Sequence, residues 1–265
     1  MSDVAFAFLL SLIAGLSTGI GGFITLFAKK TNTNFLAVSL GFSAGVMVYV
    51  SLVELLPESQ SLLSEAIGGK AGGAMAVISF FVGMIIAGVI DRILPEEDNP
   101  HDLKSHDGSG NPIAPEKKLM RTGIITAIAI TIHNFPEGIA TFISAMYDPA
   151  LALPIALAIA LHNIPEGISV AVPIYYATSD KVKAVLYSFA SGLTEPLGAL
   201  IGYFILMPFM NEVVYGVLFS MVAGIMVFIS FDELLPAARE YGEHHLSIYG
   251  VVTGMIAMAV SLVLL

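Results

Sequence analysis

Cysteine is absent from this chain of 265 residues, and charged residues are scarce. Without cysteine the protein can form neither disulfides nor thiolate metal sites. Asp, Glu, Lys and Arg together make up 12% of the residues, about half of the ~25% that is typical of a soluble domain. Apolar residues make up 56%. This composition predicts a membrane protein.

The apolar residues gather in runs that are long enough to cross a bilayer. A helix needs ~20 predominantly apolar residues for this, and the chain offers about eight such runs. They can be placed at 4–28, 35–56, 74–94, 122–143, 150–172, 184–206, 214–235 and 246–265. The sequence therefore predicts an all-α, polytopic membrane protein, with residues 1–265 forming a single transmembrane domain.

One long polar segment interrupts these runs. PEEDNPHDLKSHDGSGNPIAPEKKL, at 95–119, is rich in Pro, Gly, Asp and Lys, a composition that cannot bury a core. We expect a flexible loop over 95–121.

The distribution of Lys and Arg predicts the orientation of the spans. Nearly all of these residues fall in alternate loops, on one side of the membrane, and only Lys70 falls on the other. The loops of the basic side contain Lys29, Lys30, Arg92, Lys104, Lys117, Lys118, Arg121, Lys181, Lys183 and Arg239. Because cytoplasmic loops carry the excess of basic residues, we expect the 95–121 loop in the cytoplasm and both termini outside.

Parts of the sequence also resemble one another. AGVMVYVSLVELLP at 44–57 resembles AGIMVFISFDELLP at 223–236, and AGLSTGIGG at 14–22 resembles SGLTEPLGA at 191–199. The copies are five places apart in the order of the spans, second and seventh or first and sixth. Because five is odd, they cross the membrane in opposite directions, as in the inverted repeats of secondary transporters. Small residues recur in any membrane helix for packing, but this does not account for the shared S-x-x-E-L-L-P. We expect helices 1–3 and 6–8 to form an inverted repeat around helices 4 and 5.

The fourth and fifth spans each carry the same unusual hexamer, HNFPEG and HNIPEG. On a helix His133 and Glu137 share a face because they are four residues apart, and so do His162 and Glu166. Imidazole nitrogen and carboxylate oxygen both suit divalent first-row ions. Two such pairs facing one another would supply the four donors of a tetrahedral site.

The other hexamer residues suggest a further role. Asn134 and Asn163 point about 100° away from the His–Glu pairs, where a carbonyl oxygen could serve an adjacent ion. Pro136 and Pro165 cannot donate to the carbonyl one turn earlier, so both helices are expected to kink there and to leave an oxygen free.

Depth in the membrane supports a cation site. His133, His162 and Glu195 each fall near the middle of their spans, where a charge costs at least ~2.5 kcal/mol. Several carboxylates at this depth need a compensating cation or a water-filled cavity. A single His–Glu pair can be a buried hydrogen-bonded pair, but its repetition at matched depth favours a metal site.

Some polar residues lie outside this centre. Glu54, Asp232 and Glu233 fall near the ends of their spans and are expected to mark the two mouths of a pathway, with Glu54 toward the outside. Carboxylates at helix ends often simply face water, and this alternative stays open. Four further histidines could collect or sense metal, or belong to solvated linkers; they are His101, His106, His244 and His245.

At these residues the chain resembles the ZIP (Zrt/Irt-like) family of metal-ion transporters, most closely its bacterial zinc-uptake branch. The resemblance covers essentially the whole chain and rests on the two hexamers, on SGLTEP and on the paired ELLP segments. It implies uptake of divalent metal, with zinc preferred and iron, manganese and cobalt tolerated, through a binuclear centre. It also implies a bacterial cytoplasmic (inner) membrane and a transporter rather than an enzyme. In such a membrane the Lys and Arg distribution makes both termini periplasmic or extracellular. No enzyme cofactor is then expected, since the metal is cargo.

The resemblance implies two ligand sets. One ion would be held by His133, Glu137, His162 and Glu166. The adjacent ion would be held by Asn134, Asn163 and Glu195, with Glu137 and Glu166 bridging.

Two other functions stay open at this point. An intramembrane metal-dependent hydrolase would also place His and Glu in spans, but it needs an H-E-x-x-H type of pair, and each helix here offers one His. A metal sensor would bind without translocation, which the inverted repeat argues against. The expected partners are divalent metal ions and the lipid bilayer. No nucleic acid is expected, and a homodimer is left open, as are metal selectivity and proton coupling.

Overall fold

The computed structural model describes residues 3–29, 32–93, 115–147, 149–206, 209, 211–241 and 244–264. Within these ranges every regular element is a helix. This is the expected outcome for apolar sequence, because a segment surrounded by lipid must satisfy its backbone hydrogen bonds internally.

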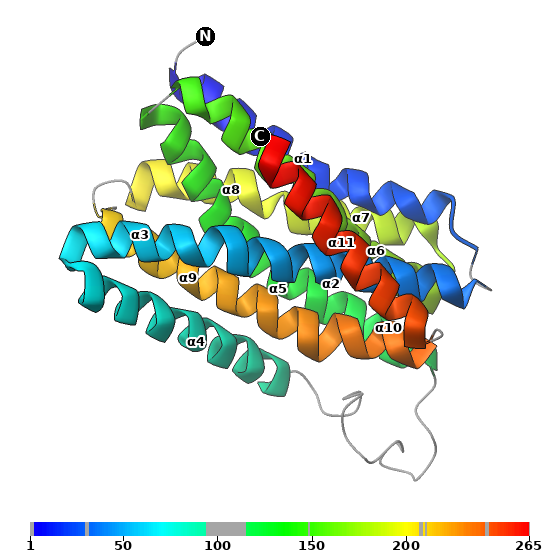
Figure 1. Cartoon of the computed structure of the whole chain (residues 1–265). Helices are drawn as coiled ribbons and strands as arrows, with labels where there is room; N and C mark the ends of the chain where they lie inside the picture. Colours follow the sequence, from blue (N-terminus) through cyan, green and yellow to red (C-terminus); the bar gives the residue numbers. More distant parts are fainter. Residues whose placement is uncertain are drawn as a thin grey trace.

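The helices join into eight continuous segments (Figure 1). In chain order these are α1 (Asp3–Gly22) with η1 (Phe23–Leu26); α2 (Thr33–Val50), η2 (Ser51–Leu55) and α3 (Leu56–Ile67); α4 (Gly69–Ile93); α5 (Pro115–Tyr147); α6 (Pro149–Thr178); α7 (Lys181–Gly192), α8 (Thr194–Ile201) and η4 (Gly202–Leu206); α9 (Glu212–Ile229), η6 (Ser230–Leu234) and α10 (Leu235–Tyr241); and α11 (His244–Leu264).

Six of these segments are long and apolar enough to cross a membrane by length and composition. They are Val4–Leu26, Thr33–Ile67, Gly69–Arg92, Lys181–Ile205, Glu212–Glu240 and His245–Leu264. The remaining two, α5 and α6, carry the hexamers and are 33 and 30 residues long. The prediction of an all-α, polytopic protein with about eight spans is confirmed.

Several helices run beyond the predicted spans. The second segment continues through α3 to Ile67, and α5 begins at Pro115, so residues 115–121 of the expected loop are helical. Residues 94–114 lie outside the described residues. In α3 the apolar run ends but one buried stripe continues, because Leu63 is fully buried and Ser59 Oγ donates to Gly216 O of α9 at 2.6 Å. The hydropathy of the sequence therefore predicts which residues lie in the apolar layer of the membrane, but not where a helix ends.

Local backbone structure confirms the inverted repeat. The two S-x-x-E-L-L-P copies both form a π-helical turn, η2 in one half and η6 in the other. In each turn the leading serine donates to the carbonyl oxygen four residues earlier, Ser51 to Met47 and Ser230 to Met226, at 2.7 Å in both cases.

Helix packing repeats in the same way. Gly83 of α4 lies so close to α9 that a Cβ would overlap the carbonyl oxygen of Met221, and Gly254 of α11 lies equally close to Phe42 O of α2. Gly83 aligns with Gly254, and Met221 with Phe42. The pair α4–α9 is therefore the repeat-related copy of the pair α11–α2, and both pairs lie side by side in Figure 1.

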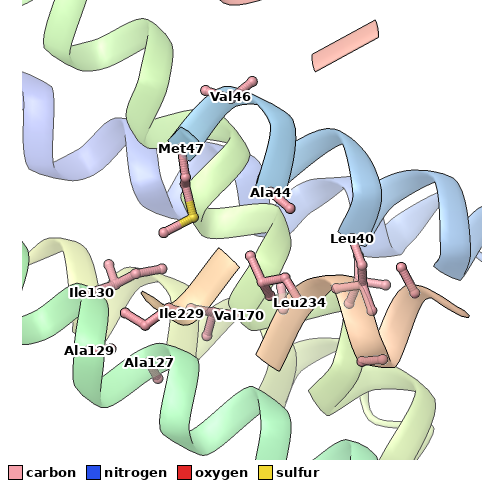
Figure 2. Close-up of a cluster of buried hydrophobic side chains, with 14 of the residues drawn as sticks. Leu40, Ala44, Val46, Met47, Ala127, Ala129, Ile130, Val170, Ile229 and Leu234 are labelled. Atoms are coloured by element: carbon pink, nitrogen blue, oxygen red, sulfur yellow. The ribbon is translucent and has the colours of Figure 1, made fainter. Parts of the chain in front are cut away.

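The largest apolar core among the described residues lies beside the hexamers. It brings together Met47 of α2, Ile130 of α5, Val170 of α6 and Ile229 of α9 (Figure 2), all of them at most 2% exposed. Ile130 lies one turn before the first hexamer, and Val170 lies one turn after the glutamate of the second. The core therefore keeps this part of α5 and α6 dry.

Candidate metal centre

The hexamers bring three ligand-type side chains together. His133 Nε2 lies 3.3 Å from Glu137 Oε2 and 3.2 Å from Glu166 Oε1. These separations are close to the ~3.4 Å between two ligand atoms of a tetrahedral ion with bonds of ~2.0–2.1 Å. The contact between α5 and α6 that the repeated pattern predicts is therefore present.

These side chains are shielded from solvent. His133 is 2% exposed, Glu137 6% and Glu166 0%. Two carboxylates in so dry a place are costly unless a cation compensates them. The imidazole of His133 supplies a positive charge only when it is protonated, so the arrangement suits a bound cation.

Glu195 extends the cluster toward α8. It lies in the first turn of α8 and is fully buried. Asn163 Nδ2 donates to Glu195 Oε2 at 2.9 Å and to Ala14 O at 3.0 Å. With its amide nitrogen used in this way, Asn163 keeps Oδ1 free of hydrogen bonds.

Asn134 repeats this arrangement from α5. Its Nδ2 donates to Ser191 O at 3.4 Å, and its Oδ1 has no hydrogen-bond partner. Glu166 Oε2 and Glu195 Oε1 lack a partner as well. An unsatisfied buried oxygen costs about 1–3 kcal/mol, and coordination to a metal satisfies several at once. The donors are nitrogen and oxygen only, a set that suits zinc and other first-row divalent ions.

The last residue of each hexamer explains how the neighbouring helices come so near. A Cβ at Gly138 would overlap the carbonyl oxygen of Glu195, and a Cβ at Gly167 would overlap that of Thr18 in α1. Only glycine allows these approaches. On the other side, Ser43 of α2 donates to Pro165 O at 2.7 Å.

Two of the predictions for the hexamers stay open. Both α5 and α6 are continuous helices through Pro136 and Pro165, and the kinks stay predictions. His162 lies in α6 directly before Asn163, but its side chain lies outside the described residues. Its place among the ligands is therefore a prediction too.

The residues expected at the pathway mouths lie in the two π-helical turns. Glu54, in η2, is partly exposed, whereas Glu233, in η6, is 2% exposed. Simple contact with water, the alternative left open for these carboxylates, does not describe Glu233. Asp232 lies beside it and is partly exposed.

Sequence reasoning missed the cation that accompanies Glu233. Arg121 Nη1 lies 3.6 Å from Glu233 Oε1, and Arg121 Nη2 lies 3.0 Å from Asp91 Oδ1. Asp91, Asp232 and Glu233 each offer an oxygen within 4.8 Å of the others. Arg121 was interpreted above as a loop charge. Its position at the start of the apolar run RTGIITAIAI is the signal that could have indicated a buried partner.

Among the described residues, His245 belongs to neither group of ligand-type side chains. His101, His106 and the side chain of His244 lie outside the described residues, as does Lys104. His245 is exposed, and its ring stacks on Tyr249 with the centroids 6.3 Å apart.

Fold and site together define a multi-pass membrane protein whose central helices carry a buried nitrogen-and-oxygen cluster suited to a divalent cation. The model of the ZIP Zinc transporter family matches residues 91–262. Zinc transporter ZupT of Streptococcus mutans is 60% identical over 258 residues, 97% of each chain. ZupT of Clostridium perfringens is 58% identical over 277 residues, 100% of this chain and 97% of its own. ZupT of Oceanobacillus iheyensis is 55% identical over 267 residues, 100% of both. The chain belongs to the ZIP zinc transporter family, a family of transporters rather than enzymes.

Proposed function

We propose that this protein takes up divalent metal ions through a binuclear centre between α5, α6 and α8. Zinc is the preferred ion, and iron, manganese and cobalt are also carried. Membership of the ZIP family supports transport of divalent metal as such. The observation that supports the place of the centre is the contact of His133 Nε2 with Glu137 and Glu166 at 3.3 and 3.2 Å in a dry interior.

The proposed ligands form two adjacent sites. His133, Glu137, His162 and Glu166 hold the first ion. Asn134, Asn163 and Glu195 hold the second, with Glu137 and Glu166 bridging the two. The free amide oxygens of both asparagines support the second site, because a carbonyl oxygen without a donor is a ready ligand for a divalent ion.

The inverted repeat supports movement of the ion rather than storage. In secondary transporters the two repeats rock against each other around a site near the bilayer midplane. We place both termini on the periplasmic or extracellular side of a bacterial cytoplasmic membrane. Glu54 then gathers ions outside, while Asp232 and Glu233 receive them near the cytoplasm.

Uptake into proteoliposomes tests this proposal. Purified protein is reconstituted with an internal metal indicator, and zinc, iron(II), manganese and cobalt are added outside, with and without a pH gradient. Transport predicts saturable flux that is largest for zinc. A sensor would bind zinc without any flux, and an intramembrane hydrolase would cleave a model substrate instead. Either result would contradict the proposal.

A further inference from the structure

Glu195 has a partner in the other half of the inverted repeat. When AGLSTGIGG is aligned with SGLTEPLGA, Thr18 matches Glu195. The structure places both residues equivalently, because the carbonyl oxygen of Glu195 lies against Gly138 and that of Thr18 against Gly167. Each is thus the residue of its helix that lies against the end of one hexamer.

The hydrogen bonds around these residues are also paired. Asn163 Nδ2 donates to Ala14 O at 3.0 Å, and Asn134 Nδ2 donates to Ser191 O, the equivalent atom, at 3.4 Å. Ser17 and Thr194, which are also equivalent in the repeat, donate to these same two carbonyl oxygens. Ser17 Oγ donates to Ala14 O at 2.5 Å, and Thr194 Oγ1 donates to Ser191 O at 2.6 Å.

The two side chains leave their helices at equivalent places. Gly15 and Gly192 lie against each other where α1 and α7 cross. Glu195 Cβ is among the nearest atoms to the Cβ position of Gly15, and Thr18 Cβ is among the nearest to that of Gly192. The local two-fold relation therefore extends to the first side-chain atom.

Beyond Cβ the side chains of Glu195 and Thr18 are no longer equivalent. Glu195 Oε2 accepts the hydrogen bond of Asn163. On the other side Thr18 is fully buried, and its Oγ1 has no hydrogen-bond partner, nor has Asn134 Oδ1. A buried hydroxyl without a partner is costly. The chain nevertheless has such a hydroxyl at Thr18, the position equivalent to the proposed ligand Glu195.

We propose that Thr18 occupies a ligand position of the second ion site, opposite Glu195. This inference rests on the proposed function. Because threonine is shorter than glutamate, the position is filled by a water held between Thr18 Oγ1 and Asn134 Oδ1, two polar groups that such a water requires. The second ion then has six oxygen donors. They are this water and one oxygen each from Asn134, Asn163, Glu195, Glu137 and Glu166.

The choice of threonine sets the properties of this site. An octahedral shell of oxygens suits harder ions such as Mn²⁺, whereas the histidine-containing site suits zinc. A neutral hydroxyl in place of a second glutamate also gives the site one negative charge fewer. The second ion is therefore held more loosely than a symmetric site would hold it.

Exchange of the two side chains tests this inference. Manganese and zinc binding are measured by titration calorimetry on the full chain in detergent. Glu195→Thr should lose manganese binding at the second site and keep zinc binding at the first site, and thermal unfolding in detergent reports whether the variant is folded. The Thr18→Glu/Glu195→Thr variant should regain manganese binding, because the carboxylate enters the same site from the other side. The matched control, Thr18→Gln/Glu195→Thr, has the same shape without the charge and should not regain it.

The outcomes separate this inference from the proposed function. A wild-type protein that binds neither metal, or whose manganese binding survives Glu195→Thr, contradicts the binuclear centre itself. Retained zinc binding without regained manganese binding in the exchange variant overturns only the role of Thr18.

A second variant tests the inference if the Thr18→Glu/Glu195→Thr variant does not fold. Thr18→Val keeps the shape and removes the hydroxyl, and should weaken manganese binding about 10–100-fold while zinc binding is unchanged. Equal manganese affinity in Thr18→Val and wild type would refute the inference.

Discussion

Two clusters of buried or partly buried carboxylates lie among the described residues, and they differ in the source of their positive charge. In the first, Asp91 and Glu233 contact the guanidinium of Arg121 at 3.0 and 3.6 Å. In the second, Glu137 and Glu166 share the imidazole of His133 at 3.3 and 3.2 Å. Arginine is charged at any physiological pH, whereas histidine gains its charge only with a proton.

The difference separates a structural cluster from a binding cluster. Both clusters contain three groups that could hold a metal ion by distance alone. The Arg121 cluster already contains a permanent cation, which links α4, α5 and η6. Among the described residues the His133 cluster contains no arginine or lysine. With Glu195 nearby it combines three carboxylates with the amide oxygens of Asn134 and Asn163, which lack a donor. We therefore propose the second cluster, and not the first, as the metal site.

Removal of the central ligands should have the largest effect. His133→Ala and Glu137→Ala are each expected to reduce metal flux by more than the ~10–100-fold typical of groups that only support a ligand. The measurement is zinc uptake into proteoliposomes at matched protein content. His245→Ala and Glu58→Ala are the controls, because both side chains are exposed, and they should transport normally. Substantial flux in His133→Ala would contradict the distinction between the clusters.

Removal of the permanent cation should affect stability instead. Arg121→Ala leaves Glu233 buried without its guanidinium, and breaking such a buried pair costs about 3–5 kcal/mol of unfolding free energy. Thermal unfolding in detergent measures this loss. The control on the same helix is Lys118→Ala, whose pair with Glu240 at 3.0 Å lies at the surface and should contribute only about 0–1 kcal/mol. Equal stability of the two variants would show that Arg121 is not structural.

Acidification should weaken metal binding by the central cluster. Imidazole and carboxylate bind a metal only when deprotonated, so protons compete with the ion. We expect zinc uptake to fall as the pH is lowered from about 8 to about 5, the range in which histidine gains its charge. Proton release on adding zinc to purified protein checks the cause. The Glu137→Gln/Glu166→Gln variant should release fewer protons than wild type, and equal release would exclude these carboxylates as the competing groups.

The smallest effect is expected at the outer mouth. Glu54 is only partly buried, and Glu54→Gln removes a charge that attracts cations without touching the central ligands. The half-saturating zinc concentration should rise by less than about fivefold, which corresponds to about 1 kcal/mol for a partly exposed charge. Uptake kinetics at low ionic strength test this. An unchanged half-saturating concentration would remove Glu54 from the pathway.

The sequence predicted the features that depend on periodicity and repetition. The spans follow from apolar runs of membrane length. The contact of His133 with both glutamates follows from i, i+4 spacing on two repeated helices. The π-helical turns at Ser51 and Ser230 were not predicted, although the shared motif marked their place, because composition does not distinguish a π turn from an α turn.

Other features depend on long-range packing, which a local pattern does not contain. Arg121 looked like a loop charge because it follows Lys117 and Lys118, yet α5 turns it inward toward α4 and η6. Glu233 looked like a helix-end carboxylate, but it is buried beside that guanidinium. Thr18 carries no chemical signal of its own. Its place against Gly167 became meaningful only when the structure showed that Glu195 lies equivalently against Gly138.

Anomalous diffraction from crystals grown with zinc tests the central claim most directly. It locates the ion without relying on activity, and it separates the two carboxylate clusters in one experiment. We predict an anomalous peak about 2.0–2.2 Å from His133 Nε2 and from carboxylate oxygens of Glu137 and Glu166, with no zinc beside Arg121. A peak among Asp91, Asp232 and Glu233, with none at His133, would contradict the account.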